Sequence, residues 1–339
     1  MDDRRARAAA LLSPAVVEYY QGYSGEGQTG GEAHAAWSSY RLRPRVLVDV
    51  SEVDTSLQLG GIALSTPVVV APAALHGLAH PDAERATVAG CVAAGALPII
   101  SARATLALED MRLPRGGWWQ QLYVLKDRGI TRDLAARSAS LGAAALVVTG
   151  DAPVLAARTA GRGSLPAAAL RISPGVGISG ATPDDLGGAE QARDATLQDA
   201  VAIADATGLP FWVKGVLRPE DALLAIEAGA AGVIVSNHGG RQLDGAISTA
   251  RALSGVVDAV NGNGGVLVDG GIRSGRDVLT ALALGAAAVC IARPVLWALA
   301  VGGADGVAAL LAELTADLVQ NLRLSGLTSV AAVPRDLLV

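Results

Sequence analysis

Aromatic residues, cysteines and runs of like charge are all scarce in this 339-residue sequence. Its two cysteines, Cys91 and Cys290, lie far apart and show no CxxC or zinc-ligand spacing. This pattern favours two buried thiols in a reducing compartment over a disulfide framework, and we expect no metal site. The formal net charge is −5 and no cluster of Lys and Arg is present, which gives no indication of a nucleic-acid partner or an anionic membrane surface.

The sequence also gives no sign of a membrane segment or a secretory leader. The apolar run Val278–Ala292 is interrupted by Gly285 and is shorter than the roughly 20 residues of a typical membrane-spanning helix. Residues 1–10 are charged and rich in alanine, and no apolar segment follows them. We therefore expect a cytoplasmic protein without a membrane span.

Hydrophobic residues, mostly Ala, Val and Leu, make up 51% of the chain, which is enough for a large core. Eight short apolar runs end in Gly, Pro or polar residues, a pattern typical of parallel strands buried on both faces. These runs are Pro67–Ala71, Leu97–Ser101, Trp119–Tyr123, Ala145–Thr149, Phe211–Lys214, Gly232–Ser236, Val266–Asp269 and Ala288–Arg293.

Helical patterns separate these runs, and several of them end at a glycine that precedes the next apolar run. They cover Pro81–Ala94, Arg128–Leu141, Pro219–Ala228 and Ser274–Leu284. Glycine at that position is typical of a helix end with a left-handed cap. The repeated alternation predicts an α/β fold, a (β/α)8 TIM barrel that forms a single domain over residues 1–339. Residues 1–60 are expected to form an N-terminal extension of helices and a capping hairpin.

One connection is much longer than the others. A segment rich in Gly, Pro and Ser, about residues 159–190, follows the fourth strand and precedes a helix expected over residues 192–207. Barrel enzymes place active-site loops after the carboxyl ends of strands, so this segment predicts an active-site lid. A disordered insertion is the alternative.

Polar groups follow the apolar part of six consecutive strands, from the third to the eighth. The carboxyl ends of barrel strands share one face, so this coincidence indicates a ligand site. In chain order the groups include Gln121, Tyr123, Thr149, Asp151, Lys214, Ser236, His238, Arg241, Asp269, Arg273 and Arg293.

The last two strand ends indicate a phosphorylated cofactor. The turn Asp269–Arg273 can bring backbone N–H groups close to an anion, and Arg273 and Arg293 can supply positive charge. Lys214 leaves a buried strand, where a lone ammonium is costly. Either an anionic cofactor ring or a salt bridge to a carboxylate such as Asp269 would offset that cost.

The segment SNHGGRQLDG at Ser236–Gly245 resembles the signature of the FMN-dependent 2-hydroxy-acid oxidase and dehydrogenase family, which includes glycolate oxidase, lactate oxidase and mandelate dehydrogenase. Further family motifs follow the same order along nearly the whole chain. They are YY at 19–20, RPR at 43–45, AHP at 79–81, QLYVLKDR at 121–128, VTGDAP at 148–153, VKGV at 213–216, DGGIRSG at 269–275, ALALGA at 281–286 and ARP at 292–294. The resemblance implies FMN as cofactor and oxidation of a small (S)-2-hydroxy acid to the 2-oxo acid.

The resemblance also implies a role for each matched residue. His238 matches the catalytic base, and Asp151 the carboxylate that orients it. Arg241 matches the arginine that binds the substrate carboxylate. The other matched substrate positions are Tyr19, Tyr123 near the substrate hydroxyl, and Arg158. The matched FMN positions are Pro72, Ala73, Ala74, Ser101, Gln121, Thr149, Lys214, Ser236, Asp269, Gly270, Gly271, Ile272, Arg273, Ala292 and Arg293.

Arg103 departs from the family pattern, which usually has an aromatic residue over the side chain of the substrate at this position. One interpretation is that Arg103 pairs with Glu109 or Asp110, or points to solvent. The other is that Arg103 contacts a second polar or anionic group on the substrate.

Two other functions stay open. The first is an FMN barrel that oxidises an amine or a specialised natural-product intermediate, and the second is a flavin-binding protein without turnover. His238, Asp151, Tyr123 and Arg241 are all present, which disfavours the second. The electron acceptor can be oxygen, a quinone or a partner protein, and the resemblance implies a homo-oligomer, commonly a tetramer.

Overall fold

The computed structural model describes residues 2–156 and 190–339, and eight parallel strands form its central sheet. The strands are β3 (Val68–Val70), β4 (Ile99–Ile100), β5 (Trp119–Leu122), β6 (Ala145–Thr149), β7 (Phe211–Val216), β8 (Gly232–Val235), β9 (Gly265–Val268) and β10 (Ala288–Ile291). Their order in the sheet is β3-β10-β9-β8-β7-β6-β5-β4. A parallel bridge between Val70 and Pro98 joins the two end strands into a nearly closed barrel. The predicted TIM barrel is confirmed.

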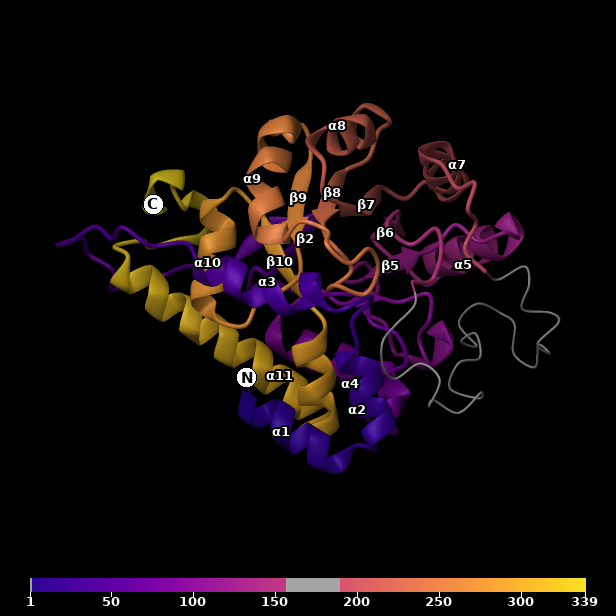
Figure 1. Cartoon of the computed structure of the whole chain (residues 1–339), viewed down its shortest axis with the longest axis horizontal. Helices are drawn as coiled ribbons and strands as arrows, with labels where there is room; N and C mark the ends of the chain where they lie inside the picture. The colour runs from indigo at the N-terminus through magenta and orange to yellow at the C-terminus, as the bar shows by residue number, and fades with distance from the viewer. Residues whose placement is uncertain (1, 157–189) are drawn as a thin grey trace.

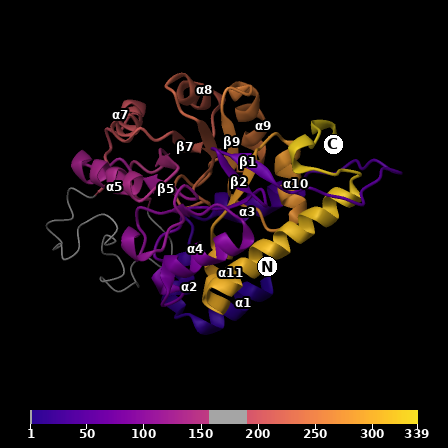
Figure 2. The same cartoon turned by 180° about the vertical axis from the view of Figure 1, so that it is seen from behind.

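Helices cover the outside of the barrel (Figures 1 and 2). In chain order they are α4 (Ala83–Ala94), α5 (Arg128–Ser140), α7 (Leu197–Thr207), α8 (Pro219–Glu227), α9 (Thr249–Val260), α10 (Gly275–Ala283) and α11 (Arg293–Leu324). A short 3-10 helix, η2 (Leu108–Asp110), follows β4 in the place where the other strands have an α-helix.

One helix starts later than the sequence pattern predicts. The sequence pattern predicts a helix over residues 192–207, but α7 begins at Leu197. The carboxylate of Asp199 accepts a hydrogen bond from the backbone N–H of Thr196 at 2.8 Å, which fixes the first turn there. Upstream, Gln191 forms an isolated antiparallel bridge with Leu125, and Arg193 and Asp194 form a turn, so the helix does not continue toward residue 192.

The N-terminal extension contains three helices and a hairpin. The helices are α1 (Asp2–Leu11), α2 (Pro14–Gln21) and α3 (Gln28–Ser38), and the hairpin pairs β1 (Leu57–Leu59) with β2 (Ile62–Leu64). The N-terminal helices are as predicted, although the hairpin ends beyond residue 60. Leu59 and Leu64 of the hairpin pack with the barrel interior and plug the amino ends of the strands.

The long helix α11 is the one helix of the described residues that is apolar and long enough to span a membrane, by length and composition. Half of its most apolar window is buried, and the helix packs against α4, α10 and α1. Gly302 and Gly303 have non-helical backbone angles and divide it into two parts. Core helices share this composition, and Figures 1 and 2 show α11 along one side of the barrel with α1 against it.

The two-residue repeat of the strands determines what fills the barrel. Alternate residues point inward and form one buried apolar cluster, which includes Val69, Ile99, Trp119, Val147, Trp212, Ile234, Leu267 and Cys290. Two residues further along each strand, the next inward-pointing side chains form a second layer at the carboxyl ends of the strands. This layer is polar on six neighbouring strands: Ser101, Gln121, Thr149, Lys214, Ser236 and Asp269.

Hydrogen bonds join the members of this polar layer across neighbouring strands. Gln121 accepts the hydroxyl of Ser101 at 3.4 Å and donates to the hydroxyl of Thr149 at 2.9 Å. On the other side, the Nζ of Lys214 lies 2.7 Å from the hydroxyl of Ser236 and 2.9 Å from Oδ2 of Asp269. The layer, called the polar belt below, therefore consists of two hydrogen-bonded trios side by side, and the salt bridge considered for Lys214 is present.

The belt controls the charge of Lys214. Burial would lower the pKa of this ammonium, but the charges of Asp269 and Asp151 and the hydrogen bond to Asp269 raise it above its usual value. Lys214 therefore stays protonated, although it is only 5% exposed. Its positive charge lies beneath the carboxyl ends of β7, β8 and β9.

We predict that Lys214 and Asp269 are strongly coupled in their contributions to the stability of the barrel. Lys214→Met should lower the free energy of unfolding by about 3–5 kcal/mol, because it leaves a buried carboxylate unpaired. Adding Asp269→Asn should recover part of this loss. The measurement is urea unfolding of the ligand-free protein, with Lys126→Met as control, since the pair of Lys126 with Glu190 is half exposed. A double variant no more stable than Lys214→Met would contradict the coupling.

Candidate active site

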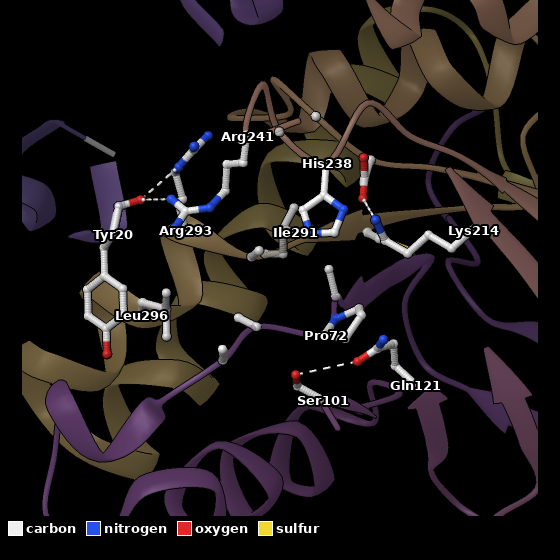
Figure 3. Close-up of a pocket in the computed structure, with 18 of the residues that line it drawn as sticks. Tyr20, Pro72, Ser101, Gln121, Lys214, His238, Arg241, Ile291, Arg293 and Leu296 are labelled. Carbon is white, nitrogen blue, oxygen red and sulfur yellow. Dashed lines mark hydrogen bonds and ion pairs between the residues drawn. The ribbon is translucent and has the colours of Figure 1, made fainter. Parts of the chain in front are cut away.

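The carboxyl ends of the strands surround a large cavity that contains most of the predicted site residues. Those that line it are Tyr19, Pro72, Ala73, Ala74, Ser101, Arg103, Gln121, Tyr123, Thr149, Lys214, His238, Arg241, Asp269, Gly270, Gly271, Ile272, Arg273, Ala292 and Arg293. Figure 3 shows His238 between Arg241 and Lys214 on one side, with Pro72, Ser101 and Gln121 on the other. Arg158 and most of the predicted lid lie outside the described residues.

Two predicted residues, Asp151 and Ser236, are behind the cavity wall and act on residues that line it. Asp151 binds His238, and Ser236 binds Lys214. The hydroxyl of Ser236 also accepts the backbone N–H of His238 at 3.1 Å and donates to Asp269 at 2.9 Å. Ser236 therefore links the loop after β8 to the polar belt.

His238 and Asp151 come together from the ends of two different strands. The imidazole Nδ1 of His238 lies 3.0 Å from Oδ1 of Asp151. Burial would raise the pKa of the Asp151 carboxyl, but the charge and hydrogen bond of His238, with the charge of Lys214, outweigh burial and hold it below its usual value. Asp151 is therefore ionised near neutral pH. It fixes Nδ1 of the imidazole as the donor and leaves Nε2 of the neutral ring as a proton acceptor.

The backbone is shaped around this pair. Gly215 in β7 has a φ of +106°, and a Cβ there would lie 2.5 Å from the Cβ and Cγ of Asp151. The register of β7 against β8 shifts between Lys214 and Val216, so Gly215 forms a bulge that makes room for the carboxylate. His238 itself has a φ of 56°, which is uncommon for a residue with a side chain and typical of a constrained functional position.

Arg241 and Arg293 both bind the carboxyl end of α2. The Nη1 of Arg241 donates to the carbonyls of Tyr19, Tyr20 and Gly22 at 3.0, 3.3 and 2.9 Å. Arg293 donates to the carbonyls of Tyr20 and Gly22 at 3.0 and 3.2 Å. The partial negative charge of a helix carboxyl end suits cations. These contacts bring Arg241 over the ring of Tyr19, 5.2 Å from its centroid, beside His238.

Tyr123 and Arg103 lie together in the cavity wall. The guanidinium carbon of Arg103 is 5.9 Å from the ring centroid of Tyr123. Burial raises the pKa of Tyr123, although the charge of Arg103 opposes this. Glu109, one of the carboxylates considered as a partner for Arg103, binds Arg137 through both of its oxygens at 2.8 and 3.0 Å. The guanidinium of Arg103 lies in the cavity wall beside Tyr123.

The turn after β9 suits an anionic group. Gly270 and Gly271 have φ values of +84° and +81°, and a Cβ on Gly271 would lie 2.2 Å from the carbonyl oxygen of Ala33. Within the described residues, the backbone N–H groups of Gly271 and Ile272 make no hydrogen bond. Two arginines, Arg273 and Arg293, line the same end of the cavity.

The polar belt beside this turn suits a flavin ring. In the described residues, Oδ1 of Asp269 is buried without a hydrogen-bond partner, so it can accept one from a ligand. The neighbouring ammonium of Lys214 suits an electron-rich ring, and the amide of Gln121 can donate or accept. The residues present therefore fit FMN, since the glycine turn suits a phosphate and the belt suits a flavin ring.

Sequence reasoning missed several residues that line the cavity. The sequence pattern indicates only a buried thiol at Cys290, yet this residue also lines the cavity. Counting back two residues from Ala292 along β10 would have identified it, because both share the inward face. Tyr20 and Gln191 also line the cavity. The hydroxyl of Tyr20 donates to the carbonyl of Leu75 at 2.7 Å, a contact between distant segments that no local pattern signals.

Comparison with known proteins agrees with this geometry. Residues 8–339 match the family model described as FMN-dependent dehydrogenase. The chain is 41% identical to L-lactate oxidase of Nostoc sp., over 94% of this chain and 92% of the relative. It is 39% identical to 2-hydroxyacid oxidase 2 of Mus musculus, over 99% and 97%.

Solved structures are similar over the same length. Mandelate oxidase with (S)-4-hydroxymandelic acid superposes with a TM-score of 0.87 at 36% identity, over 100% of this chain and 97% of that one. A mandelate oxidase variant with the C4a-OH-FMN adduct gives a TM-score of 0.85 at 36% identity, over 98% and 97%. On this evidence the chain belongs to the FMN-dependent 2-hydroxy-acid oxidase and dehydrogenase family, as an oxidoreductase that acts on CH–OH groups with FMN as its cofactor.

Proposed function

We propose that the protein oxidises a small (S)-2-hydroxy acid to the 2-oxo acid, with His238 as the base and Arg241 as the group that binds the substrate carboxylate. The observation that carries this proposal is the pair of His238 and Asp151 at the cavity, with Arg241 beside it. The mandelate oxidase complex with (S)-4-hydroxymandelic acid supports the substrate class and its configuration. The relatives are named as oxidases, which favours oxygen as the final electron acceptor.

Oxidation of a CH–OH group to C=O removes two electrons and two protons, of which a base must accept one while the other leaves with the electron pair. Nε2 of His238 accepts this proton, since its Nδ1 is already bound to Asp151. The ionised Asp151 then stabilises the imidazolium that forms. When bound, FMN supplies the acceptor for the electron pair. Lys214 provides fixed positive charge near the reacting end of the cavity.

Arg241 orients the substrate. A guanidinium can bind a carboxylate through two parallel N–H···O bonds, which fixes the position of the neighbouring carbon. The carbonyls of α2 hold one edge of this guanidinium. Tyr19 lies against the same group, and Tyr123 supplies a hydroxyl from the lining of the cavity. Arg273, Arg293 and the turn Asp269–Ile272, which line the same cavity, would bind the FMN phosphate.

Replacing His238 tests the base. His238→Ala should slow formation of the 2-oxo acid at least about 100-fold, the low end expected for a positioned base, while FMN stays bound. The measurement is initial rate at saturating substrate, with FMN content determined from the visible absorbance. His80→Ala is the control, since His80 lies outside the cavity lining. A rate for His238→Ala within a few-fold of the wild-type rate would exclude this role.

Replacing Arg241 tests the carboxylate contact. Arg241→Lys should raise the activation free energy that corresponds to kcat/KM by roughly 2–5 kcal/mol, because an ammonium cannot make the two parallel bonds. This increase lowers kcat/KM at least about 30-fold. The comparison uses the same 2-hydroxy acid for both proteins. Arg251→Lys, an exposed change on α9, should have no effect. Equal kcat/KM for Arg241→Lys and the wild type would mean that another group binds the carboxylate.

Replacing Arg103 tests which 2-hydroxy acids the enzyme prefers. A cationic wall beside Tyr123 favours a substrate with a second polar or anionic group, so 2-hydroxy dicarboxylates should react faster than lactate. Arg103→Trp should reverse this order. The measurement is kcat/KM for a panel of 2-hydroxy acids with apolar, polar and acidic side chains. An identical ranking by the two proteins would show that Arg103 has no part in selection.

A further inference from the structure

The turn that follows β9 is held from its outer side at three successive carbonyl groups. The hydroxyl of Thr249 donates to the carbonyl of Asp269 at 2.6 Å. The indole N–H of Trp37 donates to the carbonyl of Gly270 at 2.7 Å. The Nδ1 of His34 lies 3.2 Å from the carbonyl oxygen of Gly271. These three side chains form an outer bracket around the turn.

The bracket approaches from the side away from the cavity. Thr249 is the first residue of α9, and Trp37 and His34 lie on α3. None of the three is among the described residues that line the cavity, whereas Gly270 and Gly271 are. The two sides of the turn therefore have different partners.

Because each peptide unit is planar and trans, fixing the carbonyls on one side of the turn also fixes an anion site on its other side. In a trans unit the N–H points opposite to the C=O, and the described chain has no cis peptide bond. Since the carbonyls of Asp269, Gly270 and Gly271 point toward the bracket, the N–H groups of residues 270, 271 and 272 point away from it, toward the cavity. Successive N–H groups that converge in this way bind anions. The next N–H, that of Arg273, is taken by the carboxylate of Asp277 at 2.9 Å.

The bracket is rigid because α3 is fixed both where it contacts the turn and at its amino end. Trp37 is fully buried, and α3 lies so close to the turn that Gly271 has no room for a Cβ. The amino end of α3 is held by Asp244, whose carboxylate accepts the backbone N–H of Thr29 at 2.9 Å. Asp244 belongs to the segment that also carries His238 and Arg241.

We propose that Trp37 and His34 are positioning residues that hold this turn in its anion-binding orientation and give the protein its preference for a phosphorylated flavin. The inference rests on the proposed placement of the FMN phosphate at this turn. Neither side chain touches the flavin; each acts by fixing the direction of a peptide unit.

The test compares FMN with riboflavin, which has the same ring and ribityl chain but no phosphate. The flavin-free full-length protein is titrated with each, and Kd is obtained from flavin fluorescence. Trp37→Phe should raise the Kd for FMN by about 5- to 10-fold, the factor for one lost hydrogen bond. The Kd for riboflavin should stay within about twofold, because the bracket acts on the phosphate turn alone. Trp118→Phe is the matched control: Trp118 is also fully buried, and its indole nitrogen has no partner among the described residues.

His34 provides an independent variant if Trp37→Phe does not fold. More than half of its side chain is exposed, so His34→Ala should leave the fold intact. It should lower the preference for FMN over riboflavin, and His34→Gln, which keeps an N–H donor, should restore part of it. An equal loss of FMN and riboflavin binding, or no loss of either, overturns the proposal.

Arg273→Ala separates this inference from the placement of the phosphate. If Arg273→Ala abolishes the preference for FMN and the bracket variants do not, the phosphate is at the turn and the bracket has no role. If Arg273→Ala also leaves the preference unchanged, the proposed placement of the phosphate itself is wrong.

Discussion

The buried ion pair between Lys214 and Asp269 connects the two halves of the site. Asp269 begins the turn proposed to bind the phosphate, and the same carboxylate oxygen accepts Lys214 and the hydroxyl of Ser236. That hydroxyl also fixes the backbone N–H of His238. The direction of the catalytic loop and the start of the glycine turn are therefore set by one hydrogen-bonded group. An ion pair is costly in the interior unless its partners are well arranged, which gives this cluster its strict geometry.

The N-terminal extension contacts the site through the carboxyl end of α2 and the amino end of α3. The carboxyl end of α2, with its partial negative charge, binds Arg241 and Arg293. The amino end of α3, with its partial positive charge, binds the carboxylate of Asp244. Opposite charges of one loop, Arg241 and Asp244, thus meet opposite ends of two consecutive helices. This arrangement favours one position of the extension over the cavity. The reverse pairing would place Arg241 at the positive end of α3 and Asp244 at the negative end of α2.

The sequence could predict the barrel and the polar belt because both follow from local patterns. A two-residue period fixes which side chains face inward, and the end of each apolar run marks the change to a polar layer. The start of α7 could not be placed in this way, since its capping residues lie within a segment that also reads as helical. Trp37 and His34 gave no signal, because their contacts join α3 to a turn more than 230 residues away. Asp244 could be matched to a motif, but its bonds to α3 depend on the tertiary fold.

The charge of the whole chain gives no guide to the charge of its site. The net charge is −5, yet the described cavity lining contains Arg103, Lys214, Arg241, Arg273 and Arg293, with Asp269 as its carboxylate. Cations gathered in a concave, partly buried wall reinforce one another, so the cavity attracts anions although the protein as a whole repels them. FMN and a 2-hydroxy acid each bring an anionic group, and these groups lie at opposite ends of their molecules relative to the reacting atoms. A cavity with arginines on one side of His238 and a fixed ammonium on the other can therefore hold both anions near the reacting atoms before any chemistry begins.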